Sequence, residues 1–339
     1  MTGRTNEDLI AEGLAHHRAG RLPAAEAIYD AVLRAAPNHA QALQLLGVIA
    51  AQRGDHPRAV DLIRKAVHLD GTQPKYFNNL GISCQALGDL PAAELAFDEA
   101  IRLNPWFAEA HNNLGLLRKS QCRWVDAIDC FRQSIRFKGD YPDARSNLGV
   151  ALKEQGHFDE AVAECRAAVQ LCPQSAPMLT NLAAALVELN QFAEAADCCQ
   201  RAIALQSGLV EAHVSLATAL LPLGRLDESV AAAEQALRLK PDSAEARLNL
   251  ATARKAQGRL DEAIALFDET LATKPDYSEA RFNRALTLLL QGALAAGWPD
   301  YEQRWNLPAF RGLKRSFPQP EWDGSNLAGK TILLYAEQG

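Results

Sequence analysis

The sequence has few aromatic residues, no excess of basic charge and no long apolar run. Aromatic residues make up 6% of the 339 residues, and the net charge at pH 7 is −6. Such a charge lacks the basic footprint of a nucleic-acid binder. No apolar stretch approaches the roughly 20 residues that span a membrane. The N-terminal MTGRTNEDLIAEGL also lacks the pattern of a signal peptide. We therefore expect no nucleic-acid partner, no membrane span and a cytoplasmic location.

The cysteines also lack the spacing of a metal or redox site. There are seven, an odd number, and no two stand as CxxC, whereas zinc sites favour such pairs. Cys165 and Cys199 occupy a place in a repeated pattern that Phe97 and Phe131 hold elsewhere. The sequence thus predicts reduced core cysteines, with a metal or redox role as the alternative.

Recognisable catalytic patterns are missing too. The chain has no phosphate-binding loop, no metal-spaced cluster of His, Cys and carboxylates, and no nucleophile with an identifiable base. We expect no catalytic residue, no cofactor and no metal, so the chain as given is not expected to be an enzyme.

A period of 34 residues organises what is present. Nine units fall into register when residue 6 is position 1, and they cover residues 6 to about 311. Positions 8 and 20 are small, position 7 is mostly leucine, and position 24 is mostly large. Small residues let two helices approach closely, and the large residues fill the space beside that contact.

Turn residues mark the ends of two helices in each unit. Position 15 is glycine in seven units and Asn190 in one, which suits a left-handed residue just past a helix end; Cys122 is the exception. Proline recurs at position 32. Each unit is therefore predicted to be a helix, a tight turn, a second helix and a proline-marked turn.

This pattern resembles the tetratricopeptide repeat (TPR) family. The resemblance implies an all-α fold, a right-handed superhelical solenoid of about nine helix-turn-helix repeats. In that fold the first helix of each repeat, the A helix, lines a concave groove, and each unit is stabilised by its neighbours.

An asparagine row stands at position 6 of the repeat. A primary amide both donates and accepts hydrogen bonds, so it can hold the backbone C=O and N–H of an extended peptide whatever the peptide's side chains are. The alternative is that these amides only satisfy groups between repeats. The row resembles the substrate groove of O-linked N-acetylglucosamine transferases. The candidate peptide-binding residues, with two neighbours at position 5, are Asn79, Asn113, Asn147, Asn181, Asn249, Asn283, Asn78 and Asn112.

The composition changes near the C-terminus. GWPDYEQRW (297–305) is followed by a segment rich in Pro, Gly and charge and then by LAGKTILLYAEQG. TILLYA is typical of a buried parallel strand. We predict a TPR solenoid over 1–305, an extended linker over 306–328 and, over 329–339, the first β-strand of a truncated α/β domain. These pieces resemble the junction in bacterial TPR proteins that carry a C-terminal glycosyltransferase-like domain.

The sequence therefore predicts a protein–protein interaction module whose groove binds extended polypeptide. The resemblance implies the substrate-recruiting arm of a glycosyltransferase. The alternative is a non-catalytic scaffold or adaptor that assembles a multiprotein complex. The groove could also be a homo-oligomer surface, which nothing in the sequence indicates. Alanine at positions 113, 147 and 181 is expected to weaken peptide binding without unfolding the array.

Overall fold

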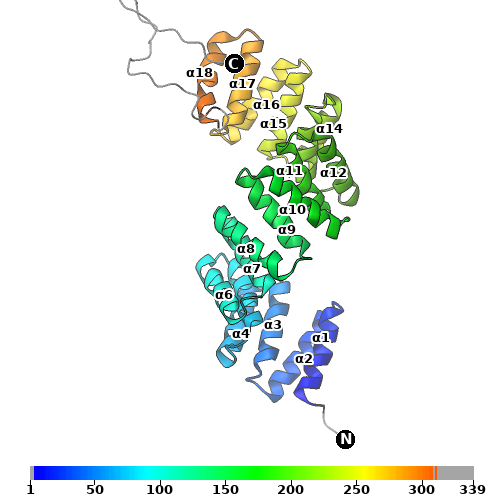
Figure 1. Cartoon of the computed structure of the whole chain (residues 1–339), viewed down its shortest axis with the longest axis vertical. Helices are drawn as coiled ribbons and strands as arrows, with labels where there is room; N and C mark the ends of the chain where they lie inside the picture. Colours follow the sequence, from blue (N-terminus) through cyan, green and yellow to red (C-terminus); the bar gives the residue numbers. More distant parts are fainter. Residues whose placement is uncertain (1–3, 308–309, 311–339) are drawn as a thin grey trace, which may run out of the picture. The chain divides into compact units, whose positions relative to one another are not determined.

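The structure is a computed structural model, and it describes residues 4–307 and 310. Figure 1 shows these residues as helices that follow one another in pairs. The helices are α1 (Asn6–Arg18), α2 (Leu22–Ala35), α3 (Ala40–Gln52), α4 (His56–Leu69), α5 (Pro74–Ala86), α6 (Leu90–Leu103), α7 (Ala108–Ser120), α8 (Trp124–Phe137), α9 (Pro142–Glu154), α10 (Phe158–Leu171), α11 (Ala176–Glu188), α12 (Phe192–Leu205), α13 (Val210–Leu220), α14 (Leu226–Leu239), α15 (Ala244–Ala256), α16 (Leu260–Thr273), α17 (Ser278–Leu290), α18 (Leu294–Tyr301) and the 3-10 helix η1 (Glu302–Asn306).

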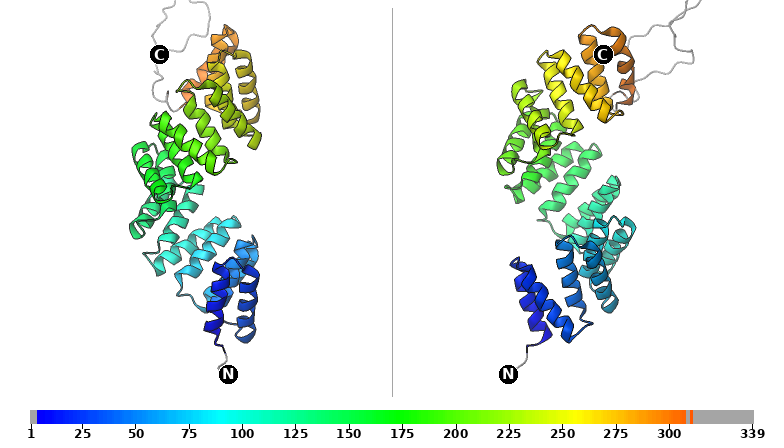
Figure 2. Two further views of the ribbon diagram at one scale, coloured as in Figure 1. Left: turned by 90° about the vertical axis from the view of Figure 1, so that its right-hand side faces the viewer. Right: turned by 180° about the vertical axis from the view of Figure 1, so that it is seen from behind.

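The helix boundaries follow the 34-residue period. The odd-numbered helices are the A helices, and all of them begin at position 1 of a 34-residue repeat, from Asn6 in α1 to Ser278 in α17. The chain separates into two compact units, Met1–Leu239 and Lys240–Gly339, which are described separately below. Within each unit the two helices of a repeat pack together, and the second helix also contacts the first helix of the next repeat (Figure 2). The predicted all-α fold of tandem helical hairpins is confirmed.

No strand occurs within residues 4–307. The strand predicted over 329–339 lies outside the described residues, and so does nearly all of the linker predicted over 306–328. The division into solenoid, linker and strand therefore stays a prediction.

The small positions of the repeat set the distance between the two helices of a hairpin. Gly115 of α7 lies against Phe131 of α8, and a Cβ atom on Gly115 would stand 2.6 Å from Cε1 of that ring. Phe131 is fully buried. Gly149 and Cys165 show the same arrangement in the next repeat, where the smaller cysteine side chain takes the place of the phenylalanine ring. The glycine thus makes room for the large residue at position 24, as the period predicts.

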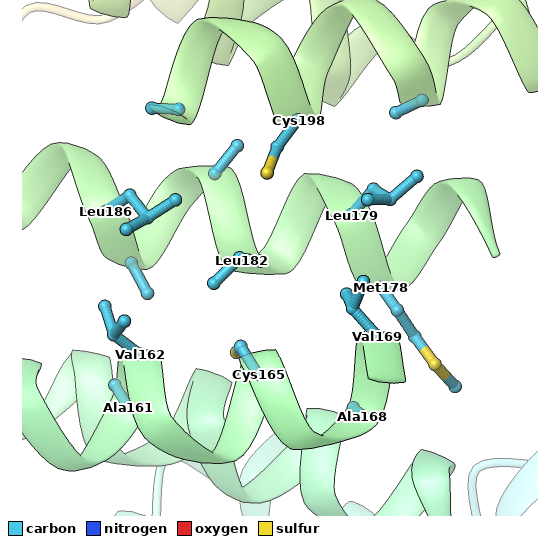
Figure 3. Close-up of a cluster of buried hydrophobic side chains, with 14 of the residues drawn as sticks. Ala161, Val162, Cys165, Ala168, Val169, Met178, Leu179, Leu182, Leu186 and Cys198 are labelled. Atoms are coloured by element: carbon cyan, nitrogen blue, oxygen red, sulfur yellow. The ribbon is translucent and has the colours of Figure 1, made fainter. Parts of the chain in front are cut away.

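The core is continuous along neighbouring repeats. Figure 3 shows α11 between α10 and α12, with Cys165 of α10 on one side of Leu182 and Cys198 of α12 on the other side of the same helix. Both cysteines are buried in this apolar cluster. Because α11 packs on both α10 and α12, its hairpin does not bury its apolar face alone, and stability comes from nearest-neighbour contacts.

The turn within each hairpin uses a left-handed residue. All seven glycines at position 15 have positive φ, and so do Asn190 (φ 57°) and Cys122 (φ 58°). After α7, the Cys122 N–H donates to the Lys119 carbonyl at 3.0 Å and the Arg123 N–H to the Arg118 carbonyl at 2.9 Å. This is the Schellman pattern of a helix C-terminus. The prediction for the seven glycines and Asn190 is therefore confirmed, and Cys122, which the sequence sets apart as the exception, adopts the same conformation.

An aromatic cluster closes the described part of the second unit. Tyr301 stacks on Phe282 of α17 with ring centroids 5.8 Å apart, and Phe310 meets the same ring at 5.4 Å. Trp298 packs edge-on against Tyr301 but remains 51% exposed. Tyr301 and Phe310 thus cover Phe282 of α17, while Trp298 keeps half of its surface exposed.

Candidate functional site

The asparagine row connects consecutive A helices of the first unit. Nδ2 of Asn113 on α7 donates to Oδ1 of Asn78 on α5 at 2.9 Å. Nδ2 of Asn147 on α9 donates to Oδ1 of Asn112 at 3.1 Å. Asn181 on α11 continues the series by donating to the Ser146 hydroxyl. Position 6 of each of these repeats is therefore bonded to position 5 of the repeat before it.

These bonds divide the predicted binding residues into two groups. Asn78 and Asn112 are 6% and 4% exposed, so they lie in the interface between repeats and serve there as acceptors. Asn113, Asn147 and Asn181 are half-buried. Each of these three uses one N–H for the bond between repeats and retains a second N–H and its own carbonyl oxygen. The row is thus part of the packing between repeats, and it keeps polar groups that a ligand can reach.

Asn79 on α5 differs from the rest of the row. Its side chain makes no hydrogen bond to any described residue. The preceding repeat has Gln44 at position 5, and Gln44 is buried. The amide of Asn79 therefore keeps both N–H groups and its carbonyl oxygen available. Sequence reasoning missed this difference, although the glutamine at position 44 marks where the pattern changes.

The remaining two members lie in the second unit. The Asn283 amide donates to the Glu279 carbonyl at 2.9 Å and accepts a bond of 2.8 Å from Nζ of Lys255. Burial lowers the pKa of Lys255, so this ammonium is held in a partly desolvated position. Asn249 lies half-buried on α15. The structure thus places Asn249 and Asn283 in a compact unit separate from the first four members of the row.

Asn79 lies at a cleft in the first unit. The cleft has a volume of about 1010 Å³ and is lined by α1, α3 and α5 together with the turns before α3 and α5. His17 of α1 and Gln52 of α3 span it with a hydrogen bond of 2.9 Å between Nε2 and Oε1. Arg18 and Lys75 also line it. The A helices of the first three repeats therefore line one polar cleft.

A second, smaller hollow adjoins the cleft. Its volume is about 230 Å³, and it lies between α3, α4 and α5. Val48, Gln52 and Asn79 line both hollows. Ala51 and Ile82 add apolar surface to the smaller one. Asn79 therefore lies where the polar cleft meets the smaller, more apolar hollow.

Arginine and lysine outnumber carboxylates in the lining of the cleft. Arg18 and Lys75 make no ion pair within the described residues. The one carboxylate in the lining, Asp70, accepts from the hydroxyl of Thr72 at 2.6 Å and from its N–H at 3.0 Å. These bonds, the hydroxyl first, lower the pKa of Asp70. Asp70 is thus held in a local turn, whereas the two cations keep their donors unpaired.

A neighbouring carboxylate, outside the cleft, does not form an ion pair with either of its two cations. Glu109 of α7 pairs with Lys138 at 3.0 Å. The pKa of Glu109 is lowered: partial burial opposes the shift, the bond from Lys138 drives it, and the charge of Lys75 adds to it. Glu109 does not line the cleft. Lys75 therefore feels this acid electrostatically without being paired to it.

The cysteines form no metal centre in the part of the chain that the structure describes. All seven are free thiols, and five are buried. Burial raises the pKa of both Cys165 and Cys199 to about 12. No group of three or more His, Cys, Asp or Glu side chains within residues 4–307 is placed to hold a metal ion.

No described helix has the length and hydropathy needed to cross a membrane.

The fold and the repeated site define a protein of tandem helical hairpins. The sequence model described as the Cilia and flagella-associated protein 70 C-terminal domain matches residues 6–214. The model described as Tetratricopeptide repeat matches residues 214–278 and 248–306. The chain therefore belongs to the TPR family. Over residues 6–214 it belongs to the family described as the Cilia and flagella-associated protein 70 C-terminal domain. It is a TPR-type scaffold for protein interaction.

Solved structures agree with this fold. The chain is similar to a chain of the APC/C hetero-tetramer Cut9-Hcn1, with a TM-score of 0.63 and 17% identity over 85% of this chain and 57% of that one. It is also similar to PilF of Pseudomonas aeruginosa, with a TM-score of 0.54 and 18% identity over 64% of this chain and 98% of PilF. These likenesses show the fold, and the chain spans little more than half of the first relative. No curated protein matches the sequence.

Proposed function

We propose that the chain binds an extended segment of a partner polypeptide along the A helices of its first unit. The observation that carries the proposal is the amide of Asn79, which has unpaired donors and an unpaired acceptor at the meeting point of two hollows. An extended backbone presents one N–H and one C=O per residue, and a primary amide can bond to both.

Spacing supports a longer contact along the row. Neighbouring A helices lie roughly 10 Å apart, and an extended chain advances about 3.3–3.6 Å per residue. About every third ligand residue would therefore meet the next asparagine. The free N–H and carbonyl of Asn113, Asn147 and Asn181 would continue what Asn79 begins. Since each hydrogen bond contributes only about 0.5–1.5 kcal/mol net, the affinity would come from several such contacts.

The test begins with peptides selected on the intact chain from a displayed library of random dodecamers. The most enriched peptide is then labelled with fluorescein, and its binding is followed by anisotropy. Asn79→Ala should weaken binding about threefold to tenfold, the range that one or two hydrogen bonds supply. Gln170→Ala, an exposed polar position on α10, is the matched control. Unchanged affinity in Asn79→Ala would contradict the proposal.

A finer version of the function concerns catalysis. We propose that the groove recruits polypeptide substrates to a glycosyltransferase-like domain of a bacterial, cytoplasmic protein. Its support is the sequence of 297–339, with GWPDYEQRW followed by PEWDG and LAGKTILLYAEQG. The buried free thiols support a reducing compartment. Sequencing the gene beyond the codon for Gly339 tests the idea: a following strand–helix pattern with a glycine-rich loop supports it. An early stop codon would favour the non-catalytic scaffold.

A further inference from the structure

We infer that the partner segment is acidic and carries one large apolar side chain, which the smaller hollow between α3, α4 and α5 accommodates. This inference rests on the proposed peptide-binding function and names the chemistry of the ligand. It has two separate structural supports, the shape of the smaller hollow and the charge of the adjoining cleft.

The size and lining of the smaller hollow suit a side chain. Its volume of about 230 Å³ is below the roughly 300–1,000 Å³ of pockets that enclose whole small molecules. Val48 and Ile82 give it apolar walls, and the fully buried Ile63 contributes to its lining. Ile82 is 41% exposed, so apolar surface remains in contact with water here. Covering that surface with leucine, isoleucine, methionine or phenylalanine removes it from water.

The position of the hollow ties it to the cleft. Asn79 lines both, so an amide that can bond to the ligand backbone stands directly beside the pocket. Successive side chains of an extended strand point to opposite sides. A backbone bonded to Asn79 can therefore direct one side chain into the hollow while its neighbours face the cleft.

The charge of the cleft selects what surrounds the apolar residue. Arg18 and Lys75 line the cleft without ion pairs in the described structure, and Asp70, whose carboxylate stays ionised in its turn with Thr72, is the one acidic residue in the lining, so positive charge exceeds negative charge there. Aspartate or glutamate in the ligand would complement the two cations. Lysine or arginine would instead place a like charge near them. Electrostatic complementarity of this kind sets partner choice more than raw affinity.

The same peptide selection tests the inference with a different readout, the composition of the binders. Peptides selected on the intact chain should be enriched in Asp and Glu and share one large apolar residue. Ile82→Gln should weaken binding of the most enriched peptide about tenfold, and Lys75→Glu should weaken it by a similar factor. Leu95→Gln and Arg34→Glu are matched controls, because both residues are exposed and lie outside the two hollows.

A double substitution identifies the contact. If the apolar residue of the peptide occupies the hollow, changing that residue to glycine should cost affinity on the intact chain and little on Ile82→Gln. Selected peptides that are basic, or that lack a shared apolar residue, would overturn the inference. So would equal affinity of the intact chain and Ile82→Gln. Failure of the proposed function looks different: no peptide is selected, or the selected peptides ignore Asn79→Ala.

Discussion

The side-chain amide of Asn147 donates a 3.1 Å hydrogen bond to Oδ1 of Asn112, a residue of the preceding repeat. Asn112 is only 4% exposed, so its oxygen has no ready substitute in water. The asparagine row therefore joins repeats together before it contacts any ligand.

Asn147→Ala should destabilise the chain. The change leaves the buried Oδ1 of Asn112 without its donor, which costs about 1–3 kcal/mol. Urea unfolding followed by circular dichroism measures the effect. Asn79→Ala is the internal control, because Asn79 has no side-chain bond to lose and should stay within about 0.5 kcal/mol of the parent. The sequence-based expectation that alanine at 113, 147 and 181 does not unfold the array stays a prediction, to which the bond between Asn147 and Asn112 adds a cost in stability. Equal stabilities of the two variants would contradict the structural role of Asn147.

Gly115→Ala should also destabilise, for a steric reason. The added Cβ would stand 2.6 Å from the Phe131 ring, and that ring is fully buried, so one of the two helices must shift. Overpacking of this kind typically costs about 1–3 kcal/mol. Gly139→Ala is the matched control, since a Cβ at Gly139 would meet nothing within 4 Å. Thermal unfolding of both variants decides the matter, and a parent-like melting temperature for Gly115→Ala would speak against the close helix contact.

Cys122→Gly should stabilise the chain. Cys122 has φ 58°, a left-handed conformation that costs a residue with a Cβ roughly 1–2 kcal/mol. Glycine adopts it readily, although its greater freedom in the unfolded chain offsets part of the gain. The net increase should be up to about 1 kcal/mol in urea unfolding. Gly156→Ala makes the reverse change at the same position of the next repeat, and should destabilise. A loss of stability in Cys122→Gly would rule out strain at this turn.

Alkaline pH should weaken the fold through buried thiols. Burial raises the pKa of Cys165 and Cys199 to about 12, whereas an unfolded thiol titrates near 8.5. Because the folded state holds these protons to higher pH, their contribution is complete below about pH 8.5. It declines as pH rises and is lost as the folded pKa is passed. The free energy of unfolding should therefore fall from about pH 8.5 to 12.

A variant with alanine at both positions separates this effect from other alkaline titrations. It should show a shallower decline over the same pH range, since Tyr29, whose pKa burial also raises to about 12, still contributes. An identical pH slope in parent and variant would mean that the two thiols do not titrate as burial predicts. The measurement is a series of urea unfolding curves at fixed ionic strength.

Much of the fold was predictable because the repeat supplies the same information nine times. The contact of Gly115 with Phe131 follows from small and large residues at fixed positions, and the left-handed turns follow from glycine or Asn190 at position 15. The site was less predictable. Whether Asn113 reaches Asn78 depends on how one repeat packs on the next, which no single repeat encodes. The cleft depends on three helices from three repeats, so its volume arises only from their packing.

The distinction between Asn79 and the rest of the row is the central claim, and one experiment tests it most directly. The peptide selected on the intact chain is titrated by calorimetry against Asn79→Ala, and the stability of the same preparation is measured in urea. We predict binding weakened about threefold to tenfold at unchanged stability. Parent-like affinity combined with lost stability would contradict the account, because it would make Asn79 one more bond between repeats.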